Sequence, residues 1–314
     1  MDKPVAPSSG FSREYVNSGE MRNQGWEVAI TATPVERKNF TWTVSGTYYR
    51  NRSEVLKLAD GVEELDIEAA FEDIGTFAVV GQPYGTIFGS AWQRNADGKL
   101  IIDPSTGLPY LDPVRKALGN PFPDFLAGIR NSFTIAQNFN VSFLWDFRKG
   151  GKIWNGTYAR LNRLGRTEES ANRDGENAEY VIDGVLGTGV VNDDGTAVAG
   201  TAANDVKVSA YDYFRSYKGD AGAAVEQHLE DGSWARLREV SASYRLNFKG
   251  NAAGKKIIQY LDFNFTAINL LLFTKYKGVD PETSLTGAGS NIQGFDYFNN
   301  PGVKTFTFGI RAGF

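Results

Sequence analysis

The chain has 314 residues with no Cys, one His and two Met, and its aromatic residues make up 13 % of the total. Without Cys there is no disulfide framework and no Cys-based nucleophile or metal site, and a lone His228 argues against His-rich metal clusters and Ser-His-Asp chemistry. The net charge of −4 comes with no clustered basic footprint, so the composition does not indicate nucleic-acid binding. We therefore expect a protein that is not an enzyme and that holds no metal or other cofactor.

Seven segments alternate between apolar and polar residues. Successive side chains of a strand point to opposite faces, so each segment is predicted to be a strand with one apolar and one polar side. No apolar run approaches the ~18 residues of a membrane-spanning helix, whereas roughly ten alternating residues suit a strand of a membrane β-barrel. In chain order the segments are 25–33, 40–50, 125–135, 139–147, 234–248, 257–268 and 304–314.

The last segment shows the pattern most clearly. Its apolar positions are Phe306, Phe308, Ile310, Ala312 and Phe314, and small or polar residues stand between them. The chain ends on an aromatic residue, as expected for the final strand of an outer-membrane barrel. The predicted fold class is all-β: about seven antiparallel strands forming the C-terminal part of a large transmembrane β-barrel with long extracellular loops.

The connections between these segments alternate in length. The connections 34–39, 136–138 and 249–256 are short, whereas 51–124, 148–233 and 269–303 are long. Bacterial barrels place tight turns on the periplasmic side and large loops outside the cell. With a periplasmic C-terminus, this order predicts that residues 1–24 are an extracellular segment and that residues 25–314 belong to the barrel.

Several polar segments resemble known kinds of site. The segments 95–99 and 192–195 resemble incomplete Ca²⁺ loops, but Asp-Gly is above all a turn signal. The carboxylates at 63–66 and 168–169 are expected to be solvated, because a glycosidase needs two carboxylates facing each other across a cleft. We expect His228 to be a solvated loop residue.

The polar sides of the strands carry charged residues that would face a barrel lumen. These residues either determine solute selectivity or simply keep the polar interior hydrated. Arg236, Arg238 and Glu239 open one strand, where ion pairing along the wall competes with a contact to a plug or a solute. The other charged candidates are Glu27, Asp146, Arg245 and Asp262.

An ordered series of motifs carries a family resemblance. The most specific is Asn-Leu-Leu-Leu-Phe-Thr-Lys-Tyr-Lys-Gly-Val-Asp-Pro-Glu-Thr-Ser at 269–284, followed by Gly-Phe-Asp-Tyr at 294–297, Pro301 and the aromatic terminal segment. Supporting motifs lie at 19–27, 118–125, 150–156 and 232–239. From about Asn17 to Phe314 the chain resembles the C-terminal barrel region of SusC-like TonB-dependent outer-membrane transporters.

The resemblance implies a barrel of about 22 strands, of which this chain would supply roughly the last third. It implies import of a bulky glycan or oligopeptide, energised by TonB–ExbB–ExbD, with a SusD-like surface lipoprotein as partner. The loops 51–124 and 148–233 would be candidates for lid and solute contacts. Phe306, Phe308, Ile310 and Phe314 resemble the terminal signal that the barrel-assembly machinery reads before insertion into outer-membrane lipid.

The first ten residues lack the basic start and apolar stretch of a secretory signal, and no plug domain is recognisable. We therefore expect a C-terminal portion of a longer protein that neither closes nor transports alone. The alternative is a soluble β-sandwich carbohydrate-binding module, in which the apolar faces would pack against each other. A glycan-active enzyme is disfavoured by the poor catalytic inventory. The sequence does not name the solute.

Overall fold

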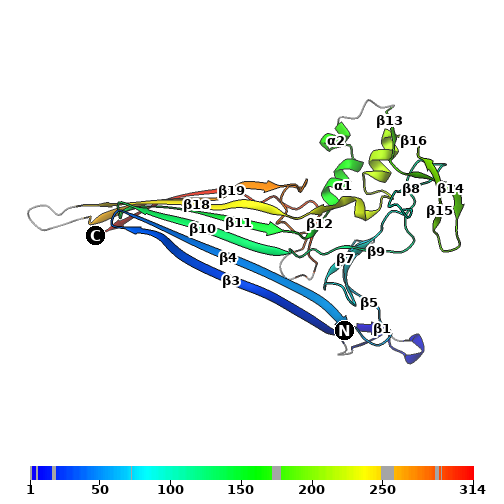
Figure 1. Ribbon diagram of the computed structural model, residues 1–314, viewed down its shortest axis with the longest axis horizontal. Helices are drawn as coiled ribbons and strands as arrows, with labels where there is room; N and C mark the ends of the chain where they lie inside the picture. Colours follow the sequence, from blue (N-terminus) through cyan, green and yellow to red (C-terminus); the bar gives the residue numbers. More distant parts are fainter. Residues whose placement is uncertain are drawn as a thin grey trace, which may run out of the picture.

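Seven long strands form one antiparallel sheet in which spatial order follows chain order (Figure 1). The computed structural model describes residues 2–4, 6–15, 19–71, 73–171, 178–248, 258–286, 290 and 292–314. All seven predicted segments are confirmed as strands of this sheet, with β3 and β21 at its two edges. The strands are β3 (Glu20–Arg37), β4 (Phe40–Lys57), β10 (Phe125–Ile135), β11 (Phe139–Lys149), β18 (Trp234–Asn247), β19 (Tyr260–Thr274) and β21 (Thr305–Gly313).

The apolar face of this sheet is bare. Ile30 is 65 % exposed, Phe308 78 % and Ile310 72 %, and nothing in the described part of the chain covers them. Phe263 is 40 % exposed, and Phe265 is half-buried. A water-soluble sandwich would bury this face against a second sheet. The β-sandwich alternative is therefore wrong, and the face has the character of a lipid-contacting wall.

Short turns and long connections lie at opposite ends of the sheet (Figure 1). The C-terminus lies at the end of the tight turns, and the smaller strands and helices gather at the other end. In the turn between β10 and β11, Ala136 and Gln137 both have positive φ, 50° and 65°. The predicted short connection 249–256 lies outside the described residues.

The long connections, predicted simply as loops, contain regular structure. One small sheet comprises β5 (Glu64–Phe71), β6 (Ile74–Val79), β7 (Thr86–Gly89) and β9 (Lys116–Gly119). A second contains β8 (Ile101–Ile102), β14 (Val185–Val191) and β15 (Ala197–Ala203), and a third contains β12 (Lys152–Asn155), β17 (Leu229–Asp231) and β20 (Phe295–Asp296). Two-stranded sheets join β13 (Glu179–Val181) to β16 (Lys207–Ser209) and, near the N-terminus, β1 (Asp2–Pro4) to β2 (Arg13–Tyr15).

Short helices complete these connections. They are α1 (Gly156–Arg163), α2 (Glu168–Ala171), α3 (Ala210–Asp212), the π-helix η2 (Tyr213–Tyr217) and the 3-10 helices η1 (Pro7–Ser9) and η3 (Val225–His228). Among the described residues, no helix combines the length and apolar composition needed to cross a membrane.

The long connections share their hydrophobic cores. One core packs Trp92 and Ile102 of the first connection against Ile182 and Val208 of the second. Another joins all three connections through Ile74, Ile87, Trp154, Ile292 and Phe295. Apolar burial of this kind stabilises a folded unit, so the three connections fold together rather than as independent loops.

Several strand ends differ from the prediction. The first strand begins at Glu20 and ends at Arg37, so Pro34 lies inside it rather than opening a turn. The pairing with β4 shifts between Ala32 and Val35, and a β-bulge is one of the few places in a sheet that accepts proline. The segment 270–273, assigned from sequence to a loop, continues β19 to Thr274.

Candidate functional site

The polar face of the sheet has an irregularity where β18 meets its neighbours. Its pairing with β11 passes from Leu144–Glu239 directly to Trp145–Leu237, which leaves Arg238 as an extra residue. The pairing with β19 shifts at the same place, where Asn269 has a φ of 58°. A bulge re-aims the side chains beyond it. As a result Arg236 and Glu239, an odd number of positions apart, both lie on the polar face.

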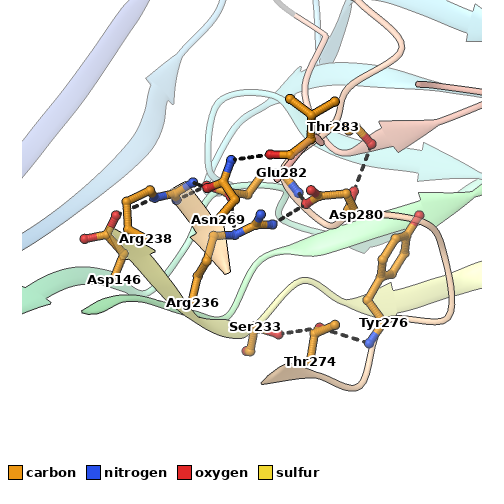
Figure 2. A network of polar contacts seen from close by, with 11 residues as sticks. Asp146, Ser233, Arg236, Arg238, Asn269, Thr274, Tyr276, Asp280, Glu282 and Thr283 are labelled. Atoms are coloured by element: carbon orange, nitrogen blue, oxygen red, sulfur yellow. Dashed lines mark hydrogen bonds and ion pairs between the residues drawn. The ribbon is translucent and has the colours of Figure 1, made fainter. Parts of the chain in front are cut away.

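These irregular residues form the polar network of Figure 2. Arg238 donates to Asp146 at 2.8 Å, to the Asn269 side chain at 3.0 Å and to Glu282 at 2.6 Å. Arg236 donates to Asp280 at 2.6 Å and forms a second ion pair with Glu282 at 2.7 Å. The predicted ion pairing at Arg236, Arg238 and Glu239 is confirmed.

The network fixes the third connection to the sheet. Asp280 and Glu282 belong to the motif at 269–284, and both carboxylates pair with β18. At the far end of this connection, the Asn269 amide donates to the Val303 carbonyl at 3.2 Å. The motif that carried the family resemblance therefore acts as a structural clamp between a connection and the wall.

Most of the predicted lumen charges are neutralised by neighbours. Glu239 pairs with Arg130 at 2.8 Å, and Asp146 pairs with Arg238 at 2.8 Å. Asp262 pairs with Arg245 at 2.7 Å and with Arg311 at 3.4 Å. Glu27 has no such partner within the described ranges. Charges paired in this way stabilise a polar wall and leave little net field for a solute.

A cavity of about 460 Å³ opens on the polar face beside the network. The side chains of Tyr49, Leu126 and Trp234 line it, together with both charged and small residues. The guanidinium carbons of Arg236 and Arg238 lie 5.7 and 5.4 Å from the Trp234 ring centre. The charged residues around it are Glu27, Asp146, Arg148, Arg238 and Glu282.

The predicted assembly residues lie on the opposite, apolar face of β21 and just beyond its end. Phe306 is 57 % exposed and Phe314 77 %. Phe265 of β19 supports the row, with its ring centre 4.9 Å from that of Phe308 and 6.5 Å from that of Phe306. Their role in assembly stays a prediction.

His228 is buried, which corrects the expectation of a solvated loop residue. Its side chain is 6 % exposed on η3, and Nε2 lies 2.9 Å from the Gly219 carbonyl oxygen. Burial lowers the pKa of His228 below its ordinary value of 6.5. Residues distant in sequence, among them Tyr158 and Lys275, lie around the same small cavity as His228, so a local sequence pattern does not predict its burial.

The two incomplete Ca²⁺ loops are turns. The Asn95 side chain accepts hydrogen bonds from the backbone N–H groups of Asp97 and Lys99, and that of Asp194 accepts from Thr196. Within the described ranges, no group of three or more His, Asp or Glu is arranged to hold a metal. Glu63, Glu64, Asp66 and Glu168 are exposed, and Glu169 is half-buried.

The buried carboxylate of Asp296 was not predicted from the sequence. Asp296 is fully buried and accepts from the Tyr276 hydroxyl at 2.6 Å and from the Thr157 hydroxyl at 3.0 Å. Burial beside this carboxylate raises the pKa of Tyr276. Asp296 and Tyr276 both lie in the motifs that carried the family resemblance, and these motifs were the only indication in the sequence that the two residues matter.

The chain is similar to two curated proteins of Formosa agariphila along almost its whole length. It is 26 % identical to TonB-dependent receptor P3 and 24 % identical to TonB-dependent receptor P39, each over 99 % of this chain. The chain spans 30 % and 32 % of the length of these relatives. These similarities support the interpretation of the chain as a fragment of a SusC/RagA-type TonB-dependent transporter. No family model matches it.

Solved structures agree on the fold of this SusC-like segment. The RagAB peptide transporter matches 98 % of the chain with a TM-score of 0.59 and 19 % identity. The RagAB peptide importer in its open-open state matches 100 % with a TM-score of 0.64 and 18 % identity. Each match covers 31 % of the neighbour's chain, so the segment corresponds to part of a larger barrel. The relatives and neighbours are named as receptors, transporters and importers.

Proposed function

We propose that this chain forms part of the wall and outer loops of an outer-membrane TonB-dependent importer for a bulky nutrient. The observation that carries the proposal is the seven-stranded sheet with one bare apolar face, its long connections gathered at one end. Such a sheet is stable when it closes with further strands and turns its apolar face to lipid. The names of the relatives support the TonB-dependent class.

The proposed orientation follows from the loops. Residues 25–314 belong to the barrel, with the long connections and residues 1–24 outside the cell and Phe314 in the periplasm. Large loops on the outer side and tight turns on the inner side are the rule for bacterial barrels. TonB–ExbB–ExbD would act through the remainder of the transporter, because this chain spans about a third of its relatives.

A SusD-like lipoprotein is the proposed partner, and a glycan or oligopeptide is the proposed solute. Both follow from the family resemblance, and the neighbour named a peptide importer supports a solute of that size. The first and second connections are the proposed lid and solute contacts. The β14–β15 hairpin lies at the outer extremity of this unit in Figure 1, and it exposes Val190 and Val191.

The importer role is tested by uptake in cells that carry the intact receptor. Radiolabelled oligopeptides and oligosaccharides should accumulate with TonB present and fail to accumulate when TonB is deleted. Equal accumulation of both solute classes in the two strains would contradict the proposal.

The lid role needs a small change, because the long connections share their cores and a whole-loop deletion would unfold its neighbours. Replacing Val190 and Val191 with Ser removes exposed apolar surface from the hairpin and leaves the pairing of β14 with Ile101 and Ile102 in place. We expect reduced lipoprotein co-purification and reduced uptake. Unchanged binding and uptake would remove the hairpin from the proposed contact surface. A Val181→Ser variant, which alters another exposed apolar residue, serves as the control.

A further inference from the structure

One row of side chains crosses the cavity on the polar face. Residues paired across neighbouring strands lie on the same side of a sheet, so the register places each member beside the next. From β3 to β18 the row reads Glu27, Tyr49, Leu126, Arg148 and Trp234. All five residues line the cavity. The row carries one acidic and one basic group, separated by an aromatic and an aliphatic side chain.

Arg148 differs from the other arginines of this face. Arg130, Arg236, Arg238 and Arg245 each form an ion pair with a carboxylate. Arg148 instead donates through Nη2 to the Pro121 carbonyl at 2.6 Å and through Nε to the Gly150 carbonyl at 3.4 Å. No carboxylate in the part of the chain that the structure describes pairs with it. The two carbonyls hold the guanidinium in place and leave Nη1 free to donate to an anion.

Glu27 is the counterpart at the other end of the row. Its side chain is exposed on β3, and none of the described cations pairs with it. Tyr49 is 44 % exposed and Leu126 37 %, so the surface between the two charges is largely apolar. The row therefore offers an acceptor for a cation, an apolar stretch and a donor for an anion.

The spacing of the two charges sets the length of a fitting solute. Glu27 and Arg148 lie on β3 and β11, three strand intervals apart, which is about 14 Å at ~4.8 Å per interval. An extended peptide covers ~3.5 Å per residue, so about four residues span this distance. In the next row of paired residues, Thr47 and Gly128 are small and leave space at the base of the cavity. A larger residue at 128 would not fit without a shift, because its Cβ would come within 2.9 Å of the Thr47 hydroxyl.

We infer that this cavity binds short peptides by their two ends, with the α-carboxylate on Arg148 and the α-ammonium on Glu27. The inference rests on the proposed function, because it requires the polar face to line the transporter's lumen. A neutral glycan can hydrogen-bond to both groups but brings an opposite charge to neither of them, and hydrogen bonds between oppositely charged groups are the stronger ones. The cavity therefore favours the peptide over the glycan among the two solute classes.

The test uses the intact receptor purified in detergent and mixtures of random tetrapeptides. Three mixtures are compared: free at both ends, amidated at the C-terminus and acetylated at the N-terminus. A neutral tetrasaccharide is the fourth probe. Hydrogen bonds to charged groups stabilise strongly, so blocking either end should weaken binding by about tenfold to hundredfold. The tetrasaccharide should bind more weakly than the free peptides.

Two variants assign the ends. Arg148→Gln should weaken binding of free peptides and leave the amidated mixture unaffected, whereas Glu27→Gln should leave only the acetylated mixture unaffected. Lys149→Gln removes the same charge from the next position, on the opposite face of β11, and should change nothing. A uniform loss for all mixtures in Arg148→Gln would indicate a structural role and overturn the inference, as would equal binding of free and blocked mixtures or preferred binding of the tetrasaccharide.

Transport separates this inference from the proposed function. TonB-dependent uptake of peptides with no discrimination between free and blocked ends would overturn the end-binding site and leave the importer standing. Uptake of both solute classes that is independent of TonB would overturn the importer itself.

Discussion

Arg236 of β18 and Asp280 of the third connection form a buried ion pair, with a donor–acceptor distance of 2.6 Å and side chains 4 % and 8 % exposed. The pair lies where the bulge in β18 turns Arg236 onto the polar face. Glu282 adds a second contact to the same guanidinium at 2.7 Å. The position of the third connection on the wall thus depends on charges that have little access to water.

Replacing Arg236 with Gln should loosen residues 275–286, because it leaves the Asp280 carboxylate buried and without its cation. Removal of one partner of a buried pair typically costs about 3–5 kcal/mol. Hydrogen exchange of this segment in the intact receptor should speed up accordingly. The control is Arg22→Gln, which breaks the exposed pair with Glu54 and should cost less than about 1 kcal/mol. Equal effects of the two variants would contradict the clamp.

Tyr276→Phe should destabilise the shared core of the connections. It removes one of the two hydroxyls that donate to fully buried Asp296, and a lost partner for a buried polar group costs about 1–3 kcal/mol. Protease sensitivity of the connections reports the change. Tyr211→Phe is the matched control, since Tyr211 is 67 % exposed and its hydroxyl accepts from Arg215 at the surface. If both variants behave like the parent, Asp296 does not depend on the Tyr276 hydroxyl.

The stability of the segment around His228 should depend on pH. Because burial lowers its folded-state pKa below 6.5, the unfolded segment binds more protons between the two pKa values. Stability is therefore full above about pH 7 and falls as pH decreases through 6.5. Hydrogen exchange of residues 225–231, corrected for the intrinsic rate, should show this loss at pH 5.5. His228→Gln should abolish the dependence; a variant that keeps it would exclude His228 as the cause.

Phe308→Ala combined with Phe314→Ala should impair insertion of the intact receptor into the outer membrane. The resemblance assigns these residues to the terminal assembly signal, and both side chains are largely exposed. Heat-modifiable migration on gels of outer-membrane fractions reports the folded barrel. Thr305→Ala with Thr307→Ala alters the same strand on its polar face and should assemble normally. Normal assembly of the phenylalanine variant would remove the proposed role.

The strands were predictable because alternation is a local property. The predicted strand 125–135 has the same two ends as β10. A polar residue precedes it and the turn at 136–138 follows it, so both ends are visible in the sequence. The predicted strand ends were wrong where a bulge interrupts the alternation. At the first strand, Pro34 was assigned to a turn. At β19, the apolar run 270–273 beside Asn269 does not alternate and was assigned to a loop. A sequence pattern does not reveal a bulge whose position is set by the neighbouring strand.

The sequence predicted which residue types lie on the polar face of the sheet, but it did not predict which of them form ion pairs with each other. Arg236 and Arg238 were expected on a polar wall, but their carboxylate partners Asp280 and Glu282 lie more than forty residues away. The shared cores likewise depend on contacts between distant segments. Local periodicity carries no information on such contacts.

The central claim is that the bare face of the sheet meets hydrocarbon. The chain has no Cys, so single cysteines can be placed along β21 of the intact receptor provided that its remaining cysteines, if any, are replaced. Spin labels at 306, 308 and 310 should be reached by membrane-dissolved oxygen, and labels at 305, 307 and 309 should not. This two-residue alternation of oxygen accessibility in outer-membrane vesicles is the predicted result. Uniform accessibility along the strand, or accessibility to a water-soluble nickel reagent at 306, 308 and 310, would contradict the account.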